Sequence, residues 1–321
     1  MKKVVVIGGG TGQSALLRGL KQVDNIELYA IVTVADDGGS TGRLRDDLHI
    51  PAMGDVRSVM LALAESESLM GDIMNYRFDN FSGALAGHNL GNIILSALTK
   101  KSGSFVQAIA DVSKVLRVKG TVIPSTLNDV TLYARTVDGR VIQGEHNITD
   151  SHTVIDRVFY DQYVAVYPDA LVAIREADYI IIGLGSVYTS ILHNIIVEDI
   201  RRELCEARAK IIYYCNCMTQ HGETDGYTVE KHVETLHKHL GKEIIDHVVY
   251  STDDIPEEML RKYEAEEAYP VVLGQKDHDY EVTGCSLLSF DTGVIRHDAD
   301  KVRRSFEKIM EEDDCCPLPV K

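Results

Sequence analysis

The sequence predicts an α/β protein with a Rossmann-like, mostly parallel sheet flanked by helices. A continuous β-branched run at residues 3–7 is followed by a glycine turn, a helical spacing of leucines at 12–21 and a second apolar run at 27–35. This is the order of a βαβ unit, which implies parallel pairing with a right-handed crossover. The same order returns later, with further apolar runs expected to form strands at 177–182, 210–214 and 247–250.

Helices are expected between these strands. The stretch 55–99 has mostly helical spacing, residues 191–209 are predicted as one helix, and Pro256 opens another. A last helix is expected around 301–310, and residues 312–321 are expected to form a flexible tail. The chain is therefore predicted to form a single α/β domain over residues 1–311.

One segment has a different periodicity. Residues 130–145 alternate around Asp138-Gly139, which is a strong signal for a β-hairpin. We therefore expect a β-rich, hairpin-containing insertion at about 120–168.

The charge balance limits the partners. The chain has 33 Lys and Arg residues against 49 Asp and Glu, a formal net charge of −16. Nonspecific nucleic-acid binding depends on neutralising many phosphates with Lys and Arg, so nucleic acid is not expected as a partner. A small phosphorylated ligand stays open, because a few local donors bind it whatever the total charge.

The cellular compartment is predicted from what the sequence lacks. The apolar run at 4–7 is too short for a signal peptide, and nothing approaches the ~18 apolar residues of a membrane span. Six cysteines occur without the regular spacing of a disulfide framework. We expect a cytoplasmic protein with reduced cysteines and no membrane insertion.

The first candidate binding element is a glycine turn. Gly8, Gly9, Gly10 and Gly12 lie between a predicted strand and a helix, where backbone N–H groups and the helix dipole face an anion. Gln13 breaks the dinucleotide fingerprint, whose glycines fall at offsets 0, 2 and 5, and no Gly-Lys-Ser/Thr follows. A phosphate cradle and a tight turn without a ligand both stay open.

Acidic, basic and hydroxyl side chains follow the second strand. Asp36 and Asp37 are placed to accept from a ribose or sugar hydroxyl, or to hold a divalent cation beside a phosphate. Further polar residues suit either phosphate binding or helix capping, and both uses stay open; they are Ser40, Thr41, Arg43, Arg45, Asp55, Arg57, His88, Asn89 and Asn92.

A second candidate phosphate cradle follows a later strand. Gly183-Leu184-Gly185 comes directly after the apolar run at 177–182, and four hydroxyl residues follow it, namely Ser186, Tyr188, Thr189 and Ser190. No Gly-x-Ser-x-Gly elbow occurs, so Ser186 is not expected to be a hydrolase nucleophile.

Metal sites are not expected from the Cys and His residues. Cys215 and Cys217 have the wrong spacing for a zinc knuckle and are expected to fill the end of a buried strand. His232, His237 and His239 are expected on the solvated face of a helix.

Five motifs occur in order along the chain: Val5-Val6-Ile7-Gly8-Gly9-Gly10-Thr11-Gly12, Thr33-Val34-Ala35-Asp36-Asp37-Gly38-Gly39-Ser40, Gly87-His88-Asn89-Leu90-Gly91-Asn92, Gly185-Ser186-Val187-Tyr188-Thr189-Ser190-Ile191-Leu192 and Asn216-Cys217-Met218-Thr219-Gln220-His221-Gly222-Glu223-Thr224. Together they resemble the gluconeogenesis factor family (YvcK-like), within the CofD-like 2-phospho-lactate transferase superfamily. The resemblance extends to Asp298. It implies a Rossmann-like core with a cleft for a nucleotide-containing ligand.

In the YvcK-like branch the resemblance implies a UDP-sugar ligand, such as UDP-N-acetylglucosamine or UDP-glucose. It also implies a regulator of cell shape and wall synthesis during gluconeogenic growth, acting with a cell-wall synthesis protein as partner. Tyr263 and Arg296 match positions associated with UDP-sugar binding, where a ring stacks on a flat ligand face and a guanidinium pairs with the diphosphate. By the same motifs the ligand set includes Thr11, Asn216, Thr219, Gln220, Glu223 and Thr224.

Two rival functions stay open beside this regulator, which has no required cofactor. One is a phospho-lactate-transferase-like enzyme acting on a nucleotide diphosphate donor, in which Asp36, Asp37 or Asp55 would hold Mg²⁺ and take the catalytic role. The other is an NAD-linked oxidoreductase, which the broken fingerprint disfavours. The acidic surface is compatible with a homodimer.

Overall fold

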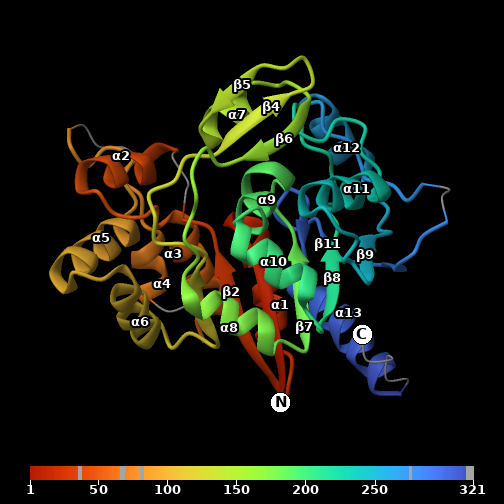
Figure 1. Ribbon diagram of the computed structural model, residues 1–321, viewed down its shortest axis with the longest axis horizontal. Coiled ribbons are helices and arrows are strands. Elements are labelled where there is room, and N and C mark those ends of the chain that lie inside the picture. Colours follow the sequence, from red (N-terminus) through yellow and green to blue (C-terminus); the bar gives the residue numbers. More distant parts are fainter. Residues whose placement is uncertain (35–37, 66–68, 80–82, 275–276, 316–321) are drawn as a thin grey trace.

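The computed structural model describes residues 1–34, 38–65, 69–79, 83–274 and 277–315. Asp36 and Asp37, two of the predicted ligand residues, lie outside the described residues, as do the last six residues of the predicted tail. The predicted α/β class is confirmed, with a parallel sheet between two layers and a separate small sheet above one edge of it (Figure 1).

The main sheet has seven strands in the order β10-β9-β8-β7-β1-β2-β3, and every neighbouring pair is parallel. In chain order these strands are β1 (Lys2–Gly8), β2 (Ile26–Val32), β3 (Thr121–Pro124), β7 (Tyr179–Gly183), β8 (Lys210–Tyr214), β9 (His247–Ser251) and β10 (Glu281–Cys285). Val4 of β1 pairs with Leu28 on one side and Tyr179 on the other. The central strands carry consecutive buried apolar residues, such as 4–7 of β1 and 179–182 of β7, because helices cover both of their faces.

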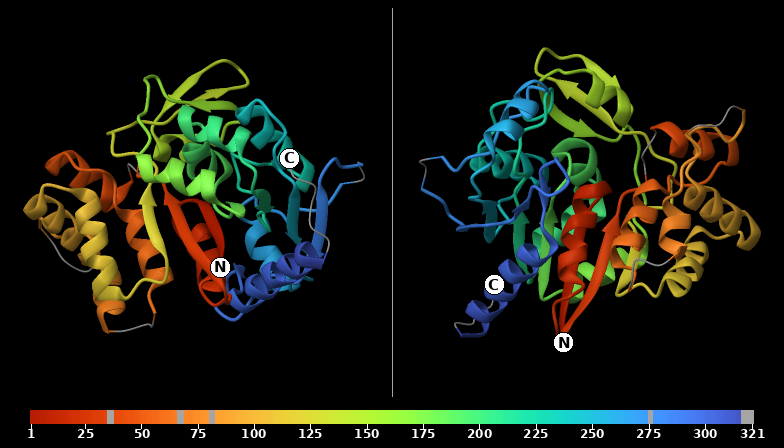
Figure 2. Two further views of the ribbon diagram at one scale, coloured as in Figure 1. Left: turned by 60° about the horizontal axis from the view of Figure 1, so that its bottom comes forward. Right: turned by 180° about the vertical axis from the view of Figure 1, so that it is seen from behind.

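Alternate residues of β1 point into two different cores. Val4 and Val6 pack with one layer of helices, made of α1 (Gly10–Leu20), α3 (Gly54–Leu63), α5 (Leu90–Ser102), α6 (Phe105–Leu116) and α13 (Ala299–Cys315). Seen from behind, α1 and α13 lie in front of the sheet (Figure 2). Val5 and Ile7 pack on the other face with α8 (Pro168–Glu176), the π-turn η1 (Val187–Ile191), α9 (Leu192–Ile195), α10 (Glu198–Glu206) and α11 (Val229–Leu240).

The predicted hairpin is confirmed. Asp138 and Gly139 connect β4 (Tyr133–Thr136) to β5 (Val141–Gln143), and β6 (Ile155–Phe159) pairs with the other side of β4. Gly139 has a φ of 88°, which glycine adopts without strain. The remaining elements are α2 (Gly39–Leu48), α4 (Leu69–Asn75), α7 (Glu145–Asp150), α12 (Glu257–Glu264), β11 (Leu288–Ser289) and β12 (Arg296–His297).

The insertion is shorter than the predicted 120–168. β3 belongs to the main sheet, because Val122 and Ile123 are buried in parallel pairing beside β2. The small antiparallel sheet therefore starts at Tyr133 and ends at Phe159.

Two helix predictions are also corrected. The single helix expected at 191–209 is broken at Val197, whose ψ of 120° is not helical, so that α10 starts anew at Glu198. The last helix continues past Met310 to Cys315, into the segment predicted as tail. Two contacts of Asp313, from Lys210 at 2.7 Å and from Tyr179 at 3.1 Å, hold that extra turn.

The histidines of α11 are not solvated as predicted. His232 is fully buried and His239 is 9% exposed. Each ring bonds the carbonyl one turn earlier, His232 to Thr228 and His239 to Thr235, both at 2.8 Å, so burial leaves that ring nitrogen satisfied. In the part of the chain that the structure describes, no helix is long and apolar enough to cross a membrane.

Candidate functional site

Two glycine turns meet at the carboxyl edge of the main sheet. β1 leads into Gly8-Gly9-Gly10 and the neighbouring β7 leads into Leu184-Gly185. A Cβ atom at Gly12 would lie 2.3 Å from the carbonyl carbon and oxygen of Leu184, so only glycine fits there. Gly12 therefore serves the packing of one turn on the other, whereas Gly9 and Gly10 form the start of α1.

The backbone of these turns is unusual in two places. Gly10 has a φ of 63°, and Leu184 has a φ of 44°, in the left-handed region that a leucine rarely occupies. Asn216, just after β8, donates from Nδ2 to the Gly185 carbonyl at 2.7 Å. Strand ends β1, β7 and β8 are thus joined into one edge, as the sequence predicted.

The Asp55 carboxylate reaches the start of α1. Its Oδ2 would lie 2.5 Å from a Cβ at Gly9, and its Oδ1 3.7 Å from a Cβ at Gly10. Helix α1 has no side-chain N-cap and no acidic residue in its own first turn. The carboxylate of α3 therefore supplies negative charge at the N-terminus of α1, where a phosphate would also be stabilised.

A cavity of about 300 Å³ opens beside this carboxylate. Two arginines line it, Arg57 from α3 and Arg77 from the segment after α4. Burial, followed by the nearby positive charge of Arg77, lowers the pKa of the Arg57 guanidinium, which still carries its charge. The other lining residues are Gly38, Ser40, Thr41, Gly54, Asp55, Ser58 and Asn92.

One wall of this cavity is a chain of polar contacts between α2 and α5. Ser40 Oγ lies 2.9 Å from His88 Nδ1 and accepts from the Asn89 backbone N–H at 3.3 Å. Asn89 caps α5 by accepting from the Asn92 N–H, and Asn92 Nδ2 donates to Thr41 Oγ1 at 3.3 Å. Burial, helped by Arg43, lowers the pKa of His88, so its ring is neutral at pH 7.

Asn92 and Arg57 each carry an orphaned polar atom at the cavity. Asn92 Oδ1 and Arg57 Nε are buried and have no hydrogen-bond partner among the described residues. Such orphans mark places where a water or ligand atom completes the bonding. Arg43 is exposed and uses Nη2 to donate to the Ala86 carbonyl at 2.8 Å.

On the β7 side, Ser186 is tied to a buried acid. Ser186 Oγ caps η1 by accepting from the Thr189 N–H at 3.0 Å, and it donates to Glu223. Gln220 and Thr149 also donate to the Glu223 carboxylate, at 2.8 and 3.2 Å. Burial raises the pKa of Glu223 against the opposing effect of these donors.

Tyr263 of α12 holds the backbone next to Arg296. The hydroxyl oxygen of Tyr263 accepts from the Ile295 N–H at 3.0 Å, and Arg296 follows in β12. Arg296 is exposed. β12 pairs with β11, where the Leu288 N–H donates to Asp253, just after β9, at 2.9 Å, so β12 is tied to the carboxyl end of β9.

Several predicted ligand residues are engaged inside the protein. Tyr188 is 1% exposed, and its hydroxyl contacts Tyr227 Oη at 2.8 Å and the Ile155 carbonyl at 3.3 Å. Thr189 is also buried. A ligand would not reach these two side chains without opening the core.

The loop after β8 uses its hydroxyls on backbone N–H groups of the protein. Thr219 Oγ1 accepts from the Tyr269 N–H at 2.8 Å, and Thr224 Oγ1 accepts from the Gln220 N–H at 2.8 Å. In contrast, Thr11 is exposed at the start of α1, and Ser190 lies beside Gly185, 3.2 Å from where a Cβ atom at Gly185 would be.

Sequence reasoning missed four residues at this edge. Arg77 and Ser58 line the arginine cavity, and their sequence neighbours contain no motif that marks them. Gln13 Nε2 donates to the Val6 and Ile31 carbonyls at 3.0 and 2.9 Å, and Asn194 Nδ2 donates to the Gly8 carbonyl at 2.9 Å. Gln13 was visible as the break in the fingerprint, and its role is to fix strands β1 and β2.

Within the described residues there is no group of three or more His, Cys, Asp and Glu side chains that could hold a metal ion. The site thus combines the N-terminus of α1 with two arginines, Arg57 and Arg77, and the carboxylate of Asp55. A family model described as 2-phospho-L-lactate transferase CofD matches residues 4–292. The chain belongs to the CofD family.

Relatives place this CofD-family chain more narrowly. A protein named gluconeogenesis factor from Bacillus subtilis (strain 168) is 46% identical over 314 residues, which cover 97% of this chain and 98% of that one. A gluconeogenesis factor from Halalkalibacterium halodurans is 42% identical over 94% of both chains. The predicted membership of the gluconeogenesis factor family is confirmed.

The fold of this CofD-family chain is also found in a solved structure. A crystal structure of a protein from Bacillus halodurans superposes with a TM-score of 0.90 and 41% identity. The match covers 95% of this chain and 99% of that one.

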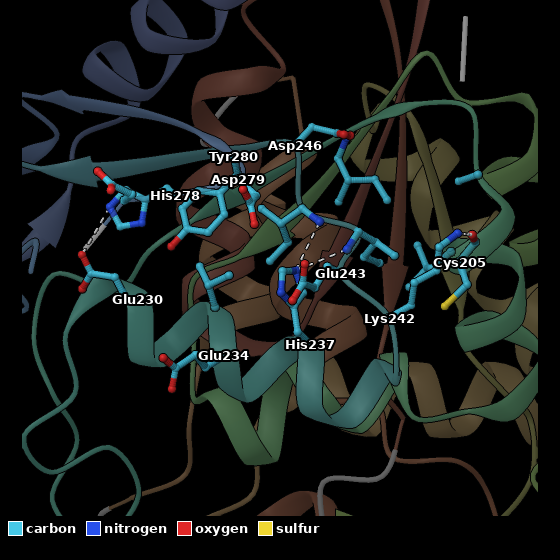
Figure 3. Close-up of a pocket in the computed structure, with 17 residues that line it drawn as sticks. Cys205, Glu230, Glu234, His237, Lys242, Glu243, Asp246, His278, Asp279 and Tyr280 are labelled. Atoms are coloured by element: carbon cyan, nitrogen blue, oxygen red, sulfur yellow. Dashed lines mark hydrogen bonds and ion pairs between the residues drawn. The ribbon is translucent and has the colours of Figure 1, made fainter. Parts of the chain in front are cut away.

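A second cavity of the CofD-family chain, of about 440 Å³, lies away from this edge, at the amino ends of β8, β9 and β10 (Figure 3). None of the described residues predicted to bind ligand lines it. His237 Nε2 accepts from the Ile244 and Ile245 N–H groups at 3.3 Å, and Lys242 donates to the Cys205 carbonyl at 2.5 Å. These polar side chains serve the protein's own backbone.

Proposed function

We propose that this chain is a UDP-sugar-binding regulator whose ligand occupies the carboxyl edge of the main sheet. The observation that carries the proposal is the arginine-lined cavity beside Asp55, whose carboxylate reaches the N-terminus of α1. A helix N-terminus alone contributes about 0.3–1 kcal/mol toward an anion, whereas micromolar binding needs about 8 kcal/mol. Arg57 and Arg77 supply the further charge that a diphosphate requires.

In this proposal the diphosphate contacts the turn at Gly8, Gly9 and Gly10. Asp36 and Asp37 face the ribose or sugar. Tyr263 and Arg296 close over the far side, since β12 is tied through β11 to the carboxyl end of β9.

Calorimetric titration with UDP-N-acetylglucosamine tests the proposal. We expect saturable binding at micromolar to millimolar ligand and no comparable binding of NAD. Absence of heat at millimolar UDP-sugar would contradict the proposal.

Arg296→Ala is the sharper test. Arg296 is exposed and no ion pair of it is found among the described residues, so the melting temperature should stay nearly unchanged while affinity falls about tenfold or more. Arg18→Ala is the matched control, because Arg18 is an exposed arginine in the last turn of α1, at the opposite edge of the sheet. Equal affinities of the two variants would remove Arg296 from the site.

The cellular part of the proposal is regulation of cell shape and wall synthesis during growth on gluconeogenic carbon sources, in the cytoplasm. The name gluconeogenesis factor of the relatives supports the link to gluconeogenic growth. Expression of Arg296→Ala in a strain lacking its own copy should fail to restore growth and normal shape on such carbon sources. Full rescue by a variant that no longer binds the ligand would separate the cellular role from UDP-sugar binding.

A second candidate is a transferase like the one after which the matching family model is described. The observation that favours it is the Asp55 carboxylate at the glycine turn, beside the cavity hydroxyls of Ser40 and Thr41, since oxygen ligands suit Mg²⁺. Asp55→Asn separates the two candidates. A transferase should lose Mg²⁺-dependent product formation from a nucleotide diphosphate donor, whereas a metal-free regulator should bind its ligand as tightly or more tightly without the negative charge.

A further inference from the structure

A third cavity, of about 460 Å³, lies between the small sheet and the helices beneath it. Its walls come from β6, the loop 160–164, the start of α10 and the end of α11. It shares no lining residue with the arginine cavity at the glycine turn. The lining residues are Arg157, Val158, Phe159, Tyr160, Gln162, Tyr163, Val164, Ile196, Glu198, Arg201 and His239. Its volume falls within the range of small-molecule pockets, about 300–1,000 Å³.

Two arginines of this cavity lack a counter-charge. Neither Arg157 nor Arg201 forms an ion pair with any carboxylate that the structure describes within 4.0 Å. Arg201 makes one long bond, from Nη1 to the Leu240 carbonyl at 3.4 Å. Glu198 is the only carboxylate among the described lining residues, and it pairs with neither arginine.

The position of Arg157 in the small sheet adds an electrostatic cost. Arg157 of β6 is directly opposite Arg135 of β4, so the two like charges share one face of the ladder. Arg135 is relieved by Asp156, with Nε and Oδ2 at 3.5 Å, but Arg157 has no such partner among the described residues. An anion held by Arg157 would offset this repulsion.

His239 adds no positive charge to the cavity. Its Nε2 accepts from the Val158 N–H at 3.1 Å and its Nδ1 bonds the Thr235 carbonyl at 2.8 Å, which fixes a neutral ring. Gln162 and the apolar side chains of Val164 and Ile196 complete the walls. Guanidinium forks are well matched to phosphate oxygens, and the apolar wall suits the carbon part of a ligand.

We propose that this cavity is a second binding site, for a small phosphorylated metabolite whose phosphate is held by Arg157 and Arg201. The site is separate from the proposed UDP-sugar cleft. Its occupant bridges the small sheet and α10, and so fixes the position of the small sheet on the main domain.

Calorimetric titration with inorganic pyrophosphate, at low ionic strength, tests the site. Wild-type protein and the double variant Arg157→Gln/Arg201→Gln are compared with Arg140→Gln/Arg261→Gln, which removes the same two charges from exposed arginines outside all the cavities. We expect the first double variant to lose about tenfold or more in affinity for one binding phase, and the control to stay within about twofold.

A third variant assigns that phase. Arg57→Gln/Arg77→Gln weakens the cleft at the glycine turn and should leave the phase in question intact. The proposal is overturned if Arg157→Gln/Arg201→Gln binds pyrophosphate as wild type does, or if the charge-matched control weakens equally.

Folding of the variants can be checked independently. Arg157→Gln alone removes a like-charge pair, so it should melt at or slightly above the wild-type temperature while still binding pyrophosphate more weakly. A single variant that folds normally and keeps full affinity would also overturn the proposal.

Discussion

The main sheet and the small sheet differ in how deeply they are buried and in how they are attached to the rest of the protein. β1 and β7 lie at the centre of a parallel ladder and are buried on both faces. The small sheet has an exposed outer strand, with Val141 58% exposed, while Ala134, Ile155 and Val158 on its inner side join the core of the main domain and polar side-chain bonds add to that packing. Lys238 pairs with Asp156 at 2.6 Å, and His239 accepts from Val158 at 3.1 Å.

The candidate site therefore lies between a rigid region, the glycine turns of the main sheet, and a more adjustable one, the small sheet. The glycine turns belong to the rigid part, where a Cβ added at Gly12 would meet the backbone of Leu184 and Gly185. The small sheet stands above the same edge (Figure 1), and its attachment combines apolar contacts with bonds of hydroxyl, imidazole and charged groups. Changes in the first region should act on global stability, and changes in the second on attachment and on pH dependence.

The largest effect is expected for Gly12→Ala. The new Cβ would lie 2.3 Å from the Leu184 carbonyl, so backbone must move, at a cost of about 3 kcal/mol or more in the free energy of unfolding. Chemical denaturation measures it. Gly71→Ala in α4 is the control, since nothing lies within 4 Å of its Cβ position, and it should be neutral or more stable by up to about 1 kcal/mol. Equal stabilities of the two variants would contradict the rigid packing of the turns.

Lowering the pH should weaken the attachment of the small sheet through protonation of His239. Burial lowers the pKa of His239 to about 4, whereas an unfolded histidine has a pKa near 6.5. The folded state therefore binds fewer protons, and the stability contributed by the neutral ring is lost as pH falls below about 6.5. Between about pH 7.5 and pH 5 this loss is about 2 kcal/mol for a group this buried.

His239→Gln measures this contribution. Its side-chain oxygen can accept from the Val158 N–H but does not titrate, so the fall in unfolding free energy from neutral to acid pH should be smaller than in wild type by about 2 kcal/mol. An unchanged pH profile would show that His239 does not carry the effect.

The smallest effect is expected for Tyr160→Phe. The Tyr160 hydroxyl donates to the His193 carbonyl at 2.6 Å, and its loss should cost about 1 kcal/mol. Tyr163→Phe is the matched control, because that hydroxyl bonds Asp199 on the surface, where the tyrosine is 66% exposed, and should change stability by less than about 0.5 kcal/mol. A larger loss of stability for Tyr163→Phe than for Tyr160→Phe would contradict the expectation that the buried hydrogen bond contributes more than the exposed one.

The fold was predictable where one local signal decides it. Apolar runs marked β1, β2, β7, β8 and β9, and Asp138-Gly139 marked the hairpin. β3 was assigned to the insertion because a short apolar run carries no information about which sheet it joins; its burial beside β2 decides that. The break at Val197 was not predicted either, since no glycine or proline marks it between residues 191 and 209.

The candidate site was predictable as a set of strand ends and less so as individual contacts. Sequence placed Gly9, Asp55 and Arg57 near a ligand, and the structure brings the last two to one cavity beside the turn. It did not show that Asp55 would reach across to α1, or that Arg77 would join Arg57. Those contacts depend on the packing of α3 against α1 and of α4 against α3 and α5, which no local pattern encodes.

The contact between Gly12 and Leu184 has a thermodynamic consequence. The glycine turn after β1 packs tightly on the turn after β7, so neither turn can shift alone. A ligand group that displaces one turn therefore also displaces the other. Binding at the two turns is then thermodynamically linked. A phosphate bound at the first turn changes the affinity at the second turn by some factor, and a group bound at the second turn changes the affinity at the first by the same factor. Affinities measured for fragments of a ligand, one turn at a time, would therefore fail to add up to the affinity of the whole.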